Sequence, residues 1–345
     1  MFIVGPCSAE TRQQLLLTAR LIHDACGAYA FVFRAGAWKP RTDPSSFQGI
    51  GTEALQWLDE ARQTYGMPVA TEVATTGHLH AALQAGIDYL WIGARTSANP
   101  IAVQELADAL AQYATQSSPD RTMPKAVLVK NPTSDDVPLW LGNIARIEAT
   151  GVPVIAVHRG CGHKPCWRMA HALRTARPDI PLLIDPSHMS GDAAQIKPLL
   201  DKAMELGYDG AMIEVHAHPE DALSDAKQQI TPEGLDRLHL TEYTPAATDR
   251  TPTESVELNW WRAEIDELDD RLWDTIARRM EVSRAIGEWK KANGVAPLQP
   301  DRYQQIVERL KAKGEKMKDS GLTTDFMLKV WETIHEESLR KQIEN

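Results

Sequence analysis

The feature that most limits the fold of this chain is an alternation of short apolar runs and helical patterns, repeated eight times. The segments between the runs have helical periodicity, as in residues 11–25, 51–65, 76–85, 100–114 and 192–206. Eight strand–helix repeats over roughly 240 residues predict a (β/α)8 TIM barrel. The main alternative is an open doubly wound sheet, but no G-x-G-x-x-G sequence follows the first run. The predicted strands are residues 2–4, 28–33, 68–73, 89–93, 126–129, 154–157, 182–184 and 211–215.

The net charge limits the class of partner. A formal charge of -10 at pH 7 argues against a nucleic acid or an anionic membrane surface as the main partner. The 4 cysteines are too few and too scattered for a disulfide framework. The first residues lack the basic leader of a signal peptide, and no apolar run reaches the length of about 18 residues that spans a membrane. We therefore expect a cytoplasmic protein without nucleic-acid or membrane partners.

Basic residues gather where the predicted strands end, which is where a barrel carries its active site. The second strand leads into Arg34 and then into Lys39-Pro40-Arg41-Thr42. Pro40 fixes its own φ and favours an extended Lys39, so Lys39 and Arg41 can point the same way. Two cations placed in this way are suited to binding a phosphate or a carboxylate.

Six cations at strand ends would meet at one mouth of the barrel. Their mutual repulsion would amount to several kcal/mol unless anions neutralise them. We therefore predict a substrate with more than one phosphate or carboxylate group. The alternative is that the cations pair with carboxylates of the barrel rim. The six residues are Arg34, Lys39, Arg41, Arg95, Lys130 and Arg159.

Candidate metal ligands end the same set of strands. Cys7, His188 and Glu214 follow strands 1, 7 and 8, which become neighbours when a barrel closes, and Asp225 lies in the loop after strand 8. Mixed S, N and O ligands suit a divalent transition metal better than Mg²⁺ or Ca²⁺, which leaves manganese, iron, cobalt and zinc open. The alternative for Cys7 is a core residue. A rival zinc cluster would be Cys161, His163 and Cys166.

Together these segments resemble the 3-deoxy-arabino-heptulosonate 7-phosphate (DAHP) synthases, over about residues 1–242. The likeness is to the branch whose barrel has no N-terminal regulatory extension. A sister family makes an octulosonate 8-phosphate from a five-carbon sugar phosphate, but the intact K-P-R-T stretch favours the four-carbon acceptor. The segments that carry the resemblance are Gly5-Pro6-Cys7-Ser8, Lys39-Pro40-Arg41-Thr42, Gly93-Ala94-Arg95-Thr96, Lys130-Asn131, His158-Arg159-Gly160, Ser187-His188 and Glu214.

The resemblance implies phosphoenolpyruvate and erythrose 4-phosphate as substrates. It also implies a divalent metal ion, preferably manganese, that acts as a Lewis acid on the acceptor aldehyde. Lys39 is the candidate proton donor to the nascent alkoxide, with a purely electrostatic role as the alternative. The implied phosphoenolpyruvate residues are Arg95, Lys130 and Arg159, with Arg34 and Lys39 nearby. The implied erythrose 4-phosphate residues are Lys39, Pro40, Arg41 and Thr42. The implied metal ligands are Cys7, His188, Glu214 and Asp225.

The last hundred residues have a different pattern. Residues 243–250 are predicted to be a linker, and residues 251–345 an all-α domain. A long helix is predicted to start with Thr251 as N-cap and Pro252 at N1, and to end at Asn293-Gly294. At about 60 Å it is too long for a small monomeric domain to bury, so we predict a homodimer through this domain. Two further helices are predicted at residues 300–318 and 323–343.

Three cations on the long helix are candidates for binding a dicarboxylate. Arg279 and Lys290 are three turns apart on one face, about 16 Å along the axis. Arg262 lies roughly 25 Å before Arg279 and about 100° round the helix, so it could serve the same pocket only from an antiparallel partner chain. The alternative is that all three are solvated surface cations.

Residues 254–345 resemble the all-helical chorismate mutases, which implies the rearrangement of chorismate to prephenate without a cofactor. Tyr303 stands where that family usually has Glu, and Gln299 where it often has Asp, so contact with the substrate hydroxyl and the strength of the activity are open. The segments that carry the resemblance are Leu258-Asn259-Trp260-Trp261-Arg262, Leu268-Asp269, Arg278-Arg279, Lys290, Asp301-Arg302 and Glu337-Ser338-Leu339-Arg340-Lys341-Gln342. The implied substrate residues are Arg262 from the partner chain, Arg279, Lys290, Arg302, Ser338 and Gln342.

We therefore predict a bifunctional enzyme of the shikimate pathway to aromatic amino acids. The alternative is a DAHP synthase whose helical domain is chiefly a regulatory module that senses chorismate or prephenate. A third interpretation is a sugar-phosphate-binding scaffold without catalysis.

Overall fold

The computed structural model describes residues 1–26, 31–41, 43–115, 122–243 and 254–343. The chain divides into two compact units, Met1–Glu264 and Ile265–Asn345. None of the helices in these described ranges combines the length and apolar character that crossing a membrane requires.

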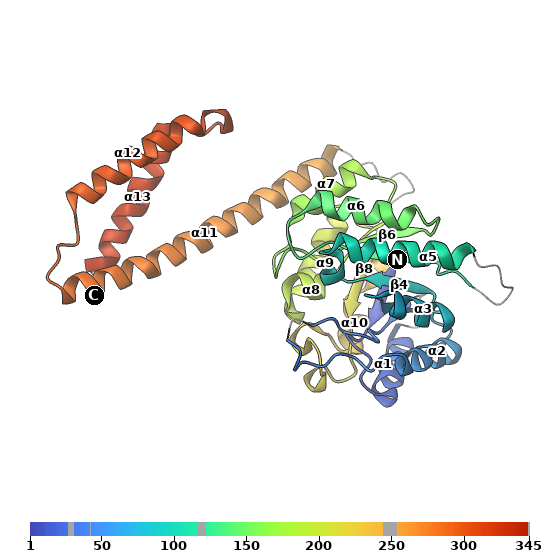
Figure 1. Ribbon diagram of the computed structural model, residues 1–345. Coiled ribbons are helices and arrows are strands. Elements are labelled where there is room, and N and C mark those ends of the chain that lie inside the picture. The colour runs from blue at the N-terminus through green and yellow to red at the C-terminus, as the bar shows by residue number, and fades with distance from the viewer. Residues whose placement is uncertain (27–30, 42, 116–121, 244–253, 344–345) are drawn as a thin grey trace. The chain divides into compact units, whose positions relative to one another are not determined.

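The first unit is a closed barrel of eight parallel strands in sequence order, surrounded by helices (Figure 1). β1 pairs with β2 on one side and with β8 on the other, and Gly5 lies beside Glu214 in the β1–β8 register. The predicted TIM barrel is therefore confirmed. The strands are β1 (Phe2–Gly5), β2 (Val32–Arg34), β3 (Val69–Glu72), β4 (Tyr89–Ile92), β5 (Ala126–Lys130), β6 (Val154–His158), β7 (Leu182–Ile184) and β8 (Gly210–Glu214).

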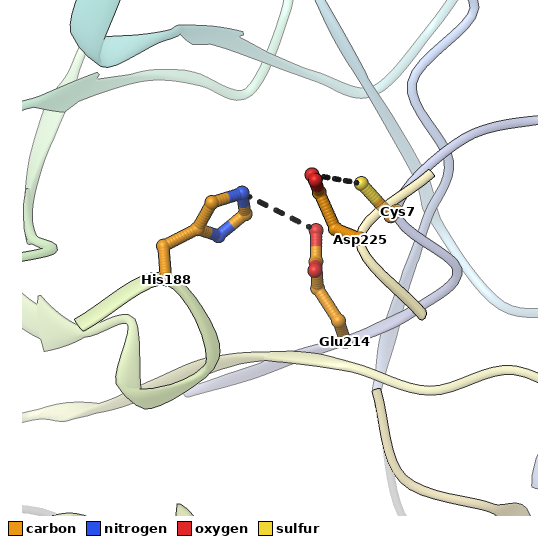
Figure 2. Close-up of side chains that lie close together, drawn as sticks. All are labelled: Cys7, His188, Glu214 and Asp225. Carbon is orange, nitrogen blue, oxygen red and sulfur yellow. Dashed lines mark hydrogen bonds and ion pairs between the residues drawn. The ribbon is translucent and has the colours of Figure 1, made fainter. Parts of the chain in front are cut away.

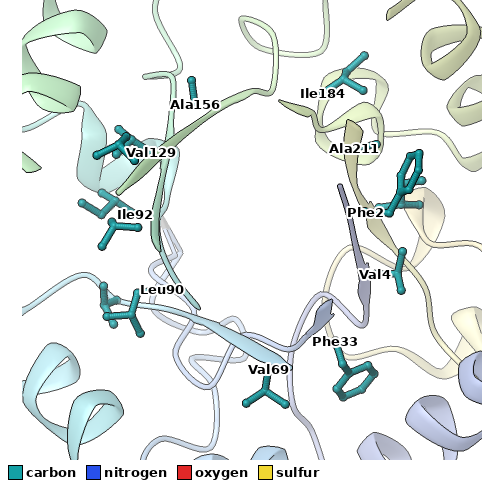
Figure 3. Close-up of a cluster of buried hydrophobic side chains, with 14 of the residues drawn as sticks. Phe2, Val4, Phe33, Val69, Leu90, Ile92, Val129, Ala156, Ile184 and Ala211 are labelled. Atoms are coloured by element: carbon teal, nitrogen blue, oxygen red, sulfur yellow. The ribbon is translucent and has the colours of Figure 1, made fainter. Parts of the chain in front are cut away.

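Side chains alternate between the barrel interior and the helical layer because successive strand residues point to opposite faces. Phe2 and Val4 point outward, with Val69 and Ile92 from other strands (Figure 3). Ile3, between Phe2 and Val4, belongs to the separate interior cluster. Side chains thus fill the barrel, and chemistry is confined to its ends. The helices of this layer are α1 (Arg12–Cys26), α2 (Glu53–Tyr65), α3 (Thr76–Gln84), α4 (Ala94–Ser97), α5 (Pro100–Thr115), α6 (Val137–Glu148), α7 (Trp167–Ala176), α8 (Pro186–Ser190), α9 (Ile196–Glu205) and α10 (Pro232–Asp236).

The C-terminal region consists of α11 (Glu254–Ala292), α12 (Pro300–Lys316) and α13 (Thr324–Ile343). The predicted stop of the long helix is confirmed: Gly294 has φ +66°, and Val295 N–H donates to Lys290 O. This left-handed position favours glycine because a side chain there is strained. The predicted N-cap residues Thr251 and Pro252, and residues 244–250 of the predicted linker, lie outside the described residues.

The division between the two compact units falls within α11, between Glu264 and Ile265. Trp260, early in α11, is fully buried in the first unit, where its ring lies 5.4 Å from that of His171 and 5.7 Å from that of Tyr208. In the second unit, Gly287 allows α11 and α13 to approach closely, because a Cβ there would lie 2.6 Å from Gln342 Cα. One helix thus contributes residues to both units.

Candidate functional site

Four side chains from the strand exits converge at one point in the barrel unit (Figure 2). Cys7 follows β1, His188 lies on α8, Glu214 ends β8 and Asp225 begins the turn Ala226–Gln228. One potential ligand atom from each lies within 4.8 Å of the others. Cys7 Sγ is 3.1 Å from Asp225 Oδ2, and His188 Nε2 is 3.5 Å from Glu214 Oε1. One sulfur, one imidazole nitrogen and two carboxylates fit a divalent transition metal.

Lys39 lies against this quartet. Its Nζ is 2.9 Å from Cys7 Sγ and 3.3 Å from Cys7 O. Burial raises the pKa of the Cys7 thiol well above its usual range, and Glu214 adds to this effect. Burial would also raise the pKa of Asp225, but Lys39 and the Cys7 thiol hold it below its ordinary value. A thiol with such a pKa ionises when a cation binds to it, so the quartet is suited to coordination and not to nucleophilic catalysis by Cys7.

The quartet borders a cavity of about 330 Å³ at the mouth of the barrel. His188 and Asp225 line it, as does Gln228. Six of the residues predicted for the two barrel substrates also line it: Lys39, Pro40, Arg41, Arg95, Lys130 and Arg159. Arg34 is not among the lining residues, and Thr42 lies outside the described residues.

The cations at this mouth differ in how they are neutralised. Arg34 pairs with Glu214 at 3.0 Å, and Arg41 pairs with Asp225 at 3.1 Å. Lys130 pairs with the Asp185 carboxylate at 2.5 Å. Carboxylates of the barrel therefore relieve part of the predicted repulsion among the cations. Arg95 and Arg159 form no ion pair with any described residue. Burial lowers the pKa of Arg159, and the nearby Arg95 lowers it slightly further. The two unpaired arginines are therefore the strongest candidates for binding an anion.

The rival zinc cluster is not assembled within the described ranges. Among the described residues, Cys161, His163 and Cys166 do not form a group whose potential ligand atoms lie close together. Cys161 Sγ instead lies 3.3 Å from Met169 Sδ. His163 lines the barrel cavity.

A second cavity, of about 350 Å³, lies among α11, α12 and α13 in the helical unit. Arg279 donates to Ile334 O at 3.2 Å and to Ser338 Oγ. Lys290 Nζ donates to Gln342 Oε1 at 3.0 Å and to Pro297 O at 2.5 Å. The predicted residues that line the cavity are Arg279, Lys290, Arg302, Ser338 and Gln342.

Two features of this cavity bear on the predictions. Arg262, predicted to act from a partner chain, is exposed in the first compact unit and does not line the cavity. Gln299 and Tyr303 do line it. The two positions that depart from the mutase pattern are therefore part of the candidate binding surface.

Comparison with known proteins gives the family. Residues 1–246 match the DAHP synthetase I family. The chain belongs to the DAHP synthetase I family. Residues 261–343 match a second family, chorismate mutase type II, so the chain fuses a DAHP synthase domain to a chorismate mutase domain. Both are families of enzymes, and the DAHP synthase family is metal-dependent.

The two domains resemble different relatives. The phospho-2-dehydro-3-deoxyheptonate aldolase of Thermotoga maritima is 33% identical over 235 residues, which are 66% of this chain and 64% of that protein. Its crystal structure matches with a TM-score of 0.59 at 32% identity, covering 69% of this chain and 66% of that chain. The 4-amino-4-deoxychorismate mutase of Streptomyces venezuelae is 34% identical over 88 residues, which are 26% of this chain and 82% of that protein. The chain thus spans less than two thirds of the length of the aldolase that it resembles.

Asp185 supports the candidate site of the barrel, although its sequence position after β7 was not assigned a role. Its carboxylate accepts from His188 Nδ1 at 2.9 Å, which turns His188 Nε2 toward Glu214. It also accepts from Lys130 Nζ at 2.5 Å. Burial would raise the pKa of Asp185, but His188 and Lys130 hold it well below its usual range.

The sequence also did not identify Glu72 and Gln228 as site residues. Glu72 lines the cavity, and a Cβ at Gly93 would lie 2.1 Å from its Oε1, so glycine there leaves room for the carboxylate. Gln228 donates to Glu214 Oε2 at 2.7 Å and fixes that carboxylate beside Arg34. Glu72 is the last residue of β3, so its position at a strand end was a signal that could have found it. Gln228 is held by a tertiary hydrogen bond and has no such signal.

We expect Asp185→Asn to lower the free energy of unfolding by about 3 kcal/mol, because it leaves the buried Lys130 without a charge partner. The pKa of Asp185 is lower in the folded protein than in the unfolded chain. This stabilisation is therefore fully present above the unfolded-state pKa of about 3.9, and it is lost as the pH falls through the folded-state pKa. Urea unfolding at pH 7 measures the change, with the exposed Asp24→Asn as the matched control. Equal unfolding free energies for the two variants would contradict the role given to Asp185.

Proposed function

We propose that the barrel catalyses the metal-dependent condensation of phosphoenolpyruvate with erythrose 4-phosphate to DAHP and phosphate. The observation that carries this proposal is the convergence of the Cys7, His188, Glu214 and Asp225 quartet on a cavity that also holds Arg159. Family membership supports the same reaction.

The unpaired cations indicate how the substrates bind. Arg95 and Arg159, with Lys130, would hold the phosphate and the carboxylate of phosphoenolpyruvate. Lys39, Pro40 and Arg41, which line the same cavity, would hold erythrose 4-phosphate, and the contribution of Thr42 stays a prediction. Arg34 would act indirectly, because it contacts Glu214 and Cys7 O and not the cavity.

The reaction joins C3 of phosphoenolpyruvate to the aldehyde carbon, water adds at C2, and phosphate leaves with cleavage of the C–O bond. A divalent ion, preferably manganese, bound by the quartet would supply Lewis-acid polarisation of the aldehyde. Burial lowers the pKa of Lys39, but the Cys7 and Glu72 side chains more than offset this, so Nζ stays protonated. It would then donate a proton to the alkoxide that forms at the aldehyde oxygen.

An assay of phosphoenolpyruvate consumption and phosphate release tests the substrate choice. With the metal-loaded full chain, we expect erythrose 4-phosphate to be used with a kcat/KM at least about 100-fold above that of arabinose 5-phosphate, since the intact Lys39-Pro40-Arg41-Thr42 stretch favours the four-carbon acceptor. Preference for arabinose 5-phosphate would move the chain to the octulosonate reaction. If no phosphate is released with either sugar phosphate, only the scaffold interpretation of the barrel would remain.

We propose that the helical domain rearranges chorismate to prephenate. The supporting observation is a cavity that brings together Arg279, Lys290 and Gln342. In the reaction one C–O bond breaks while one C–C bond forms, and no proton is transferred. The cations would hold the two carboxylates in the compact conformer, and Lys290 and Gln342 would stabilise charge at the ether oxygen.

We also propose a homodimer through α11. The helix exposes large apolar side chains at spacings of three and four residues, which is the pattern of a paired helix seam. A second copy of α11 would cover this seam and could bring its own Arg262 to the cavity. The exposed residues are Leu258, Trp261, Ile265, Leu268 and Leu272.

A regulatory role for the helical domain is the second candidate. One observation favours it: α11 carries Trp260, which is buried in the barrel unit, and Arg279, which lines the helical cavity. A ligand that changes the helical domain could therefore change the barrel's rate. The phosphate-release assay, repeated with saturating prephenate, tests this, and an unchanged rate would remove the proposal.

A cytoplasmic location stays a prediction.

A further inference from the structure

Asp225 is the ligand of the quartet that lies farthest along the chain from a barrel strand. It belongs to the loop after β8, which ends at Glu214. Its backbone has φ +51°, in the left-handed region where a residue with a side chain is at a disadvantage. Contacts with neighbouring segments must therefore hold this part of the loop in place.

Glu10, in the segment after β1, makes the first set of these contacts. Its side chain is buried, and its Oε1 accepts from Leu223 N–H at 2.9 Å and from Ser8 Oγ at 3.2 Å. Because the Ser8 hydroxyl donates its hydrogen to Glu10, its oxygen accepts from Ser224 Oγ at 2.5 Å. One carboxylate oxygen thus holds the two residues that precede Asp225, one directly and one through Ser8.

A buried glutamine makes the second set of contacts. Gln229 Oε1 accepts from Cys7 N–H at 3.0 Å, and its Nε2 donates to Ser224 O at 2.8 Å. The loop after β8 is therefore attached at two points to the segment that carries Cys7. In this arrangement the side chains of Cys7 and Asp225 face one another, with Sγ 3.1 Å from Oδ2 (Figure 2).

The surroundings of Glu10 assign it no direct part in binding. Among the described residues it belongs neither to the lining of the barrel cavity nor to the ligand quartet. His216 Nε2 lies 3.8 Å from Glu10 Oε2, which is too far for a hydrogen bond. His216 Nδ1 accepts from His218 N–H at 3.0 Å. The hydrogen bonds of Glu10 thus go to the segment that precedes Asp225, directly and through Ser8.

We propose that Glu10 is a positioning residue for the metal site, because it holds residues 223–225 so that the Asp225 carboxylate faces Cys7. The inference rests on the proposed metal-dependent function of the barrel and extends it to a residue outside the ligand set. Groups that orient metal ligands typically change metal affinity by about 10- to 100-fold. Since Glu10 acts by accepting hydrogen bonds, the role requires an oxygen at this position and not a negative charge.

The test measures the Kd for Mn²⁺ of the full chain without substrates, from the electron paramagnetic resonance signal of free Mn²⁺ during a titration. Glu10→Ala should raise the Kd about tenfold or more. Glu10→Gln removes the charge but keeps an oxygen that can accept from Leu223 N–H, so its Kd should stay within about twofold of the original.

Asp88→Ala is the matched control. Asp88 also accepts from a backbone N–H, that of Val69 at 3.0 Å, but at the opposite end of the barrel from the cavity. Its loss should leave the Kd for Mn²⁺ unchanged. An equal rise of the Kd in Asp88→Ala and Glu10→Ala would indicate a general loss of structure and would overturn the inference.

The remaining outcomes separate the inference from the proposed function. If Glu10→Ala binds Mn²⁺ as tightly as the unmodified protein, the inference fails and the proposed metal site stands. Equal losses in Glu10→Ala and Glu10→Gln would assign the effect to charge and would also overturn it. If Glu10→Ala does not fold, Ser8→Ala breaks the link to Ser224 alone and should raise the Kd about fivefold, whereas an unchanged Kd would reject the inference. If the unmodified protein binds no Mn²⁺, the proposed metal site fails and the inference fails with it.

Discussion

Replacing Cys7 by serine is expected to lower the kcat of DAHP formation by about 100-fold or more. Serine has nearly the same shape, but its hydroxyl does not ionise near neutral pH and is a poor metal ligand, whereas a thiolate binds a transition metal strongly. The steady-state rate of phosphate release measures the effect. Bound metal, determined by elemental analysis of the same samples, should fall in parallel.

The matched control for this variant is Cys26→Ser. Cys26 is a half-buried thiol outside the quartet, with a pKa raised by burial to about 11. We expect its kcat to stay close to that of the unmodified protein. Treatment of the unmodified protein with EDTA should abolish the condensation, and added Mn²⁺ should restore it. Full activity after exhaustive removal of metal, or an equal loss in both serine variants, would contradict the proposed metal site.

Replacing Arg279 by alanine is expected to lower kcat/KM for chorismate by about 100- to 1,000-fold, because the variant loses a half-buried cation that lines the helical cavity. The neighbouring Arg278→Ala is the matched control, since Arg278 is exposed and pairs only with Glu281 among the described residues. DAHP formation should be unchanged in both variants. Similar losses in the two variants would indicate that charge on α11 acts in general and not through the cavity.

Mixing the Arg279→Ala variant with an Arg262→Ala variant tests whether Arg262 acts from a partner chain. Arg262→Ala should be as inactive as Arg279→Ala when each is measured alone. Mixed and reassociated chains should recover about a quarter of the activity, because half of the dimers would be mixed and each mixed dimer would have one intact site. Recovery near zero would mean that both arginines serve the same chain or that the chains do not pair through α11.

The sequence predicted which side chains meet at the barrel mouth where their position depends only on which strand they end. Cys7, His188 and Glu214 could be placed together because strands 1, 7 and 8 are adjacent in any barrel of this order. Asp185 and Gln228 could not be identified, because their roles depend on side-chain hydrogen bonds to His188 and Glu214. Such contacts are set by packing and leave no periodic pattern in the chain.

The charge argument was only partly right for the same reason. Position at a strand end predicted that Arg34 would approach the mouth, but not that it would pair with Glu214 and lie over the Trp91 ring at 4.7 Å. In the helical region, the C-cap signal Asn293-Gly294 predicted the end of α11 to within a residue or two. It could not predict that the compact unit of the barrel includes the first turns of α11, because burial of Trp260 depends on rings from α7 and the segment before β8.

The most direct test of the central claim is the position of the metal in crystals grown with Mn²⁺, located by anomalous diffraction. We predict one strong peak at about 2.0–2.5 Å from Cys7 Sγ, His188 Nε2 and carboxylate oxygens of Glu214 and Asp225. A peak in the loop that holds Cys161 and Cys166, or no peak at the barrel mouth at saturating Mn²⁺, would contradict it.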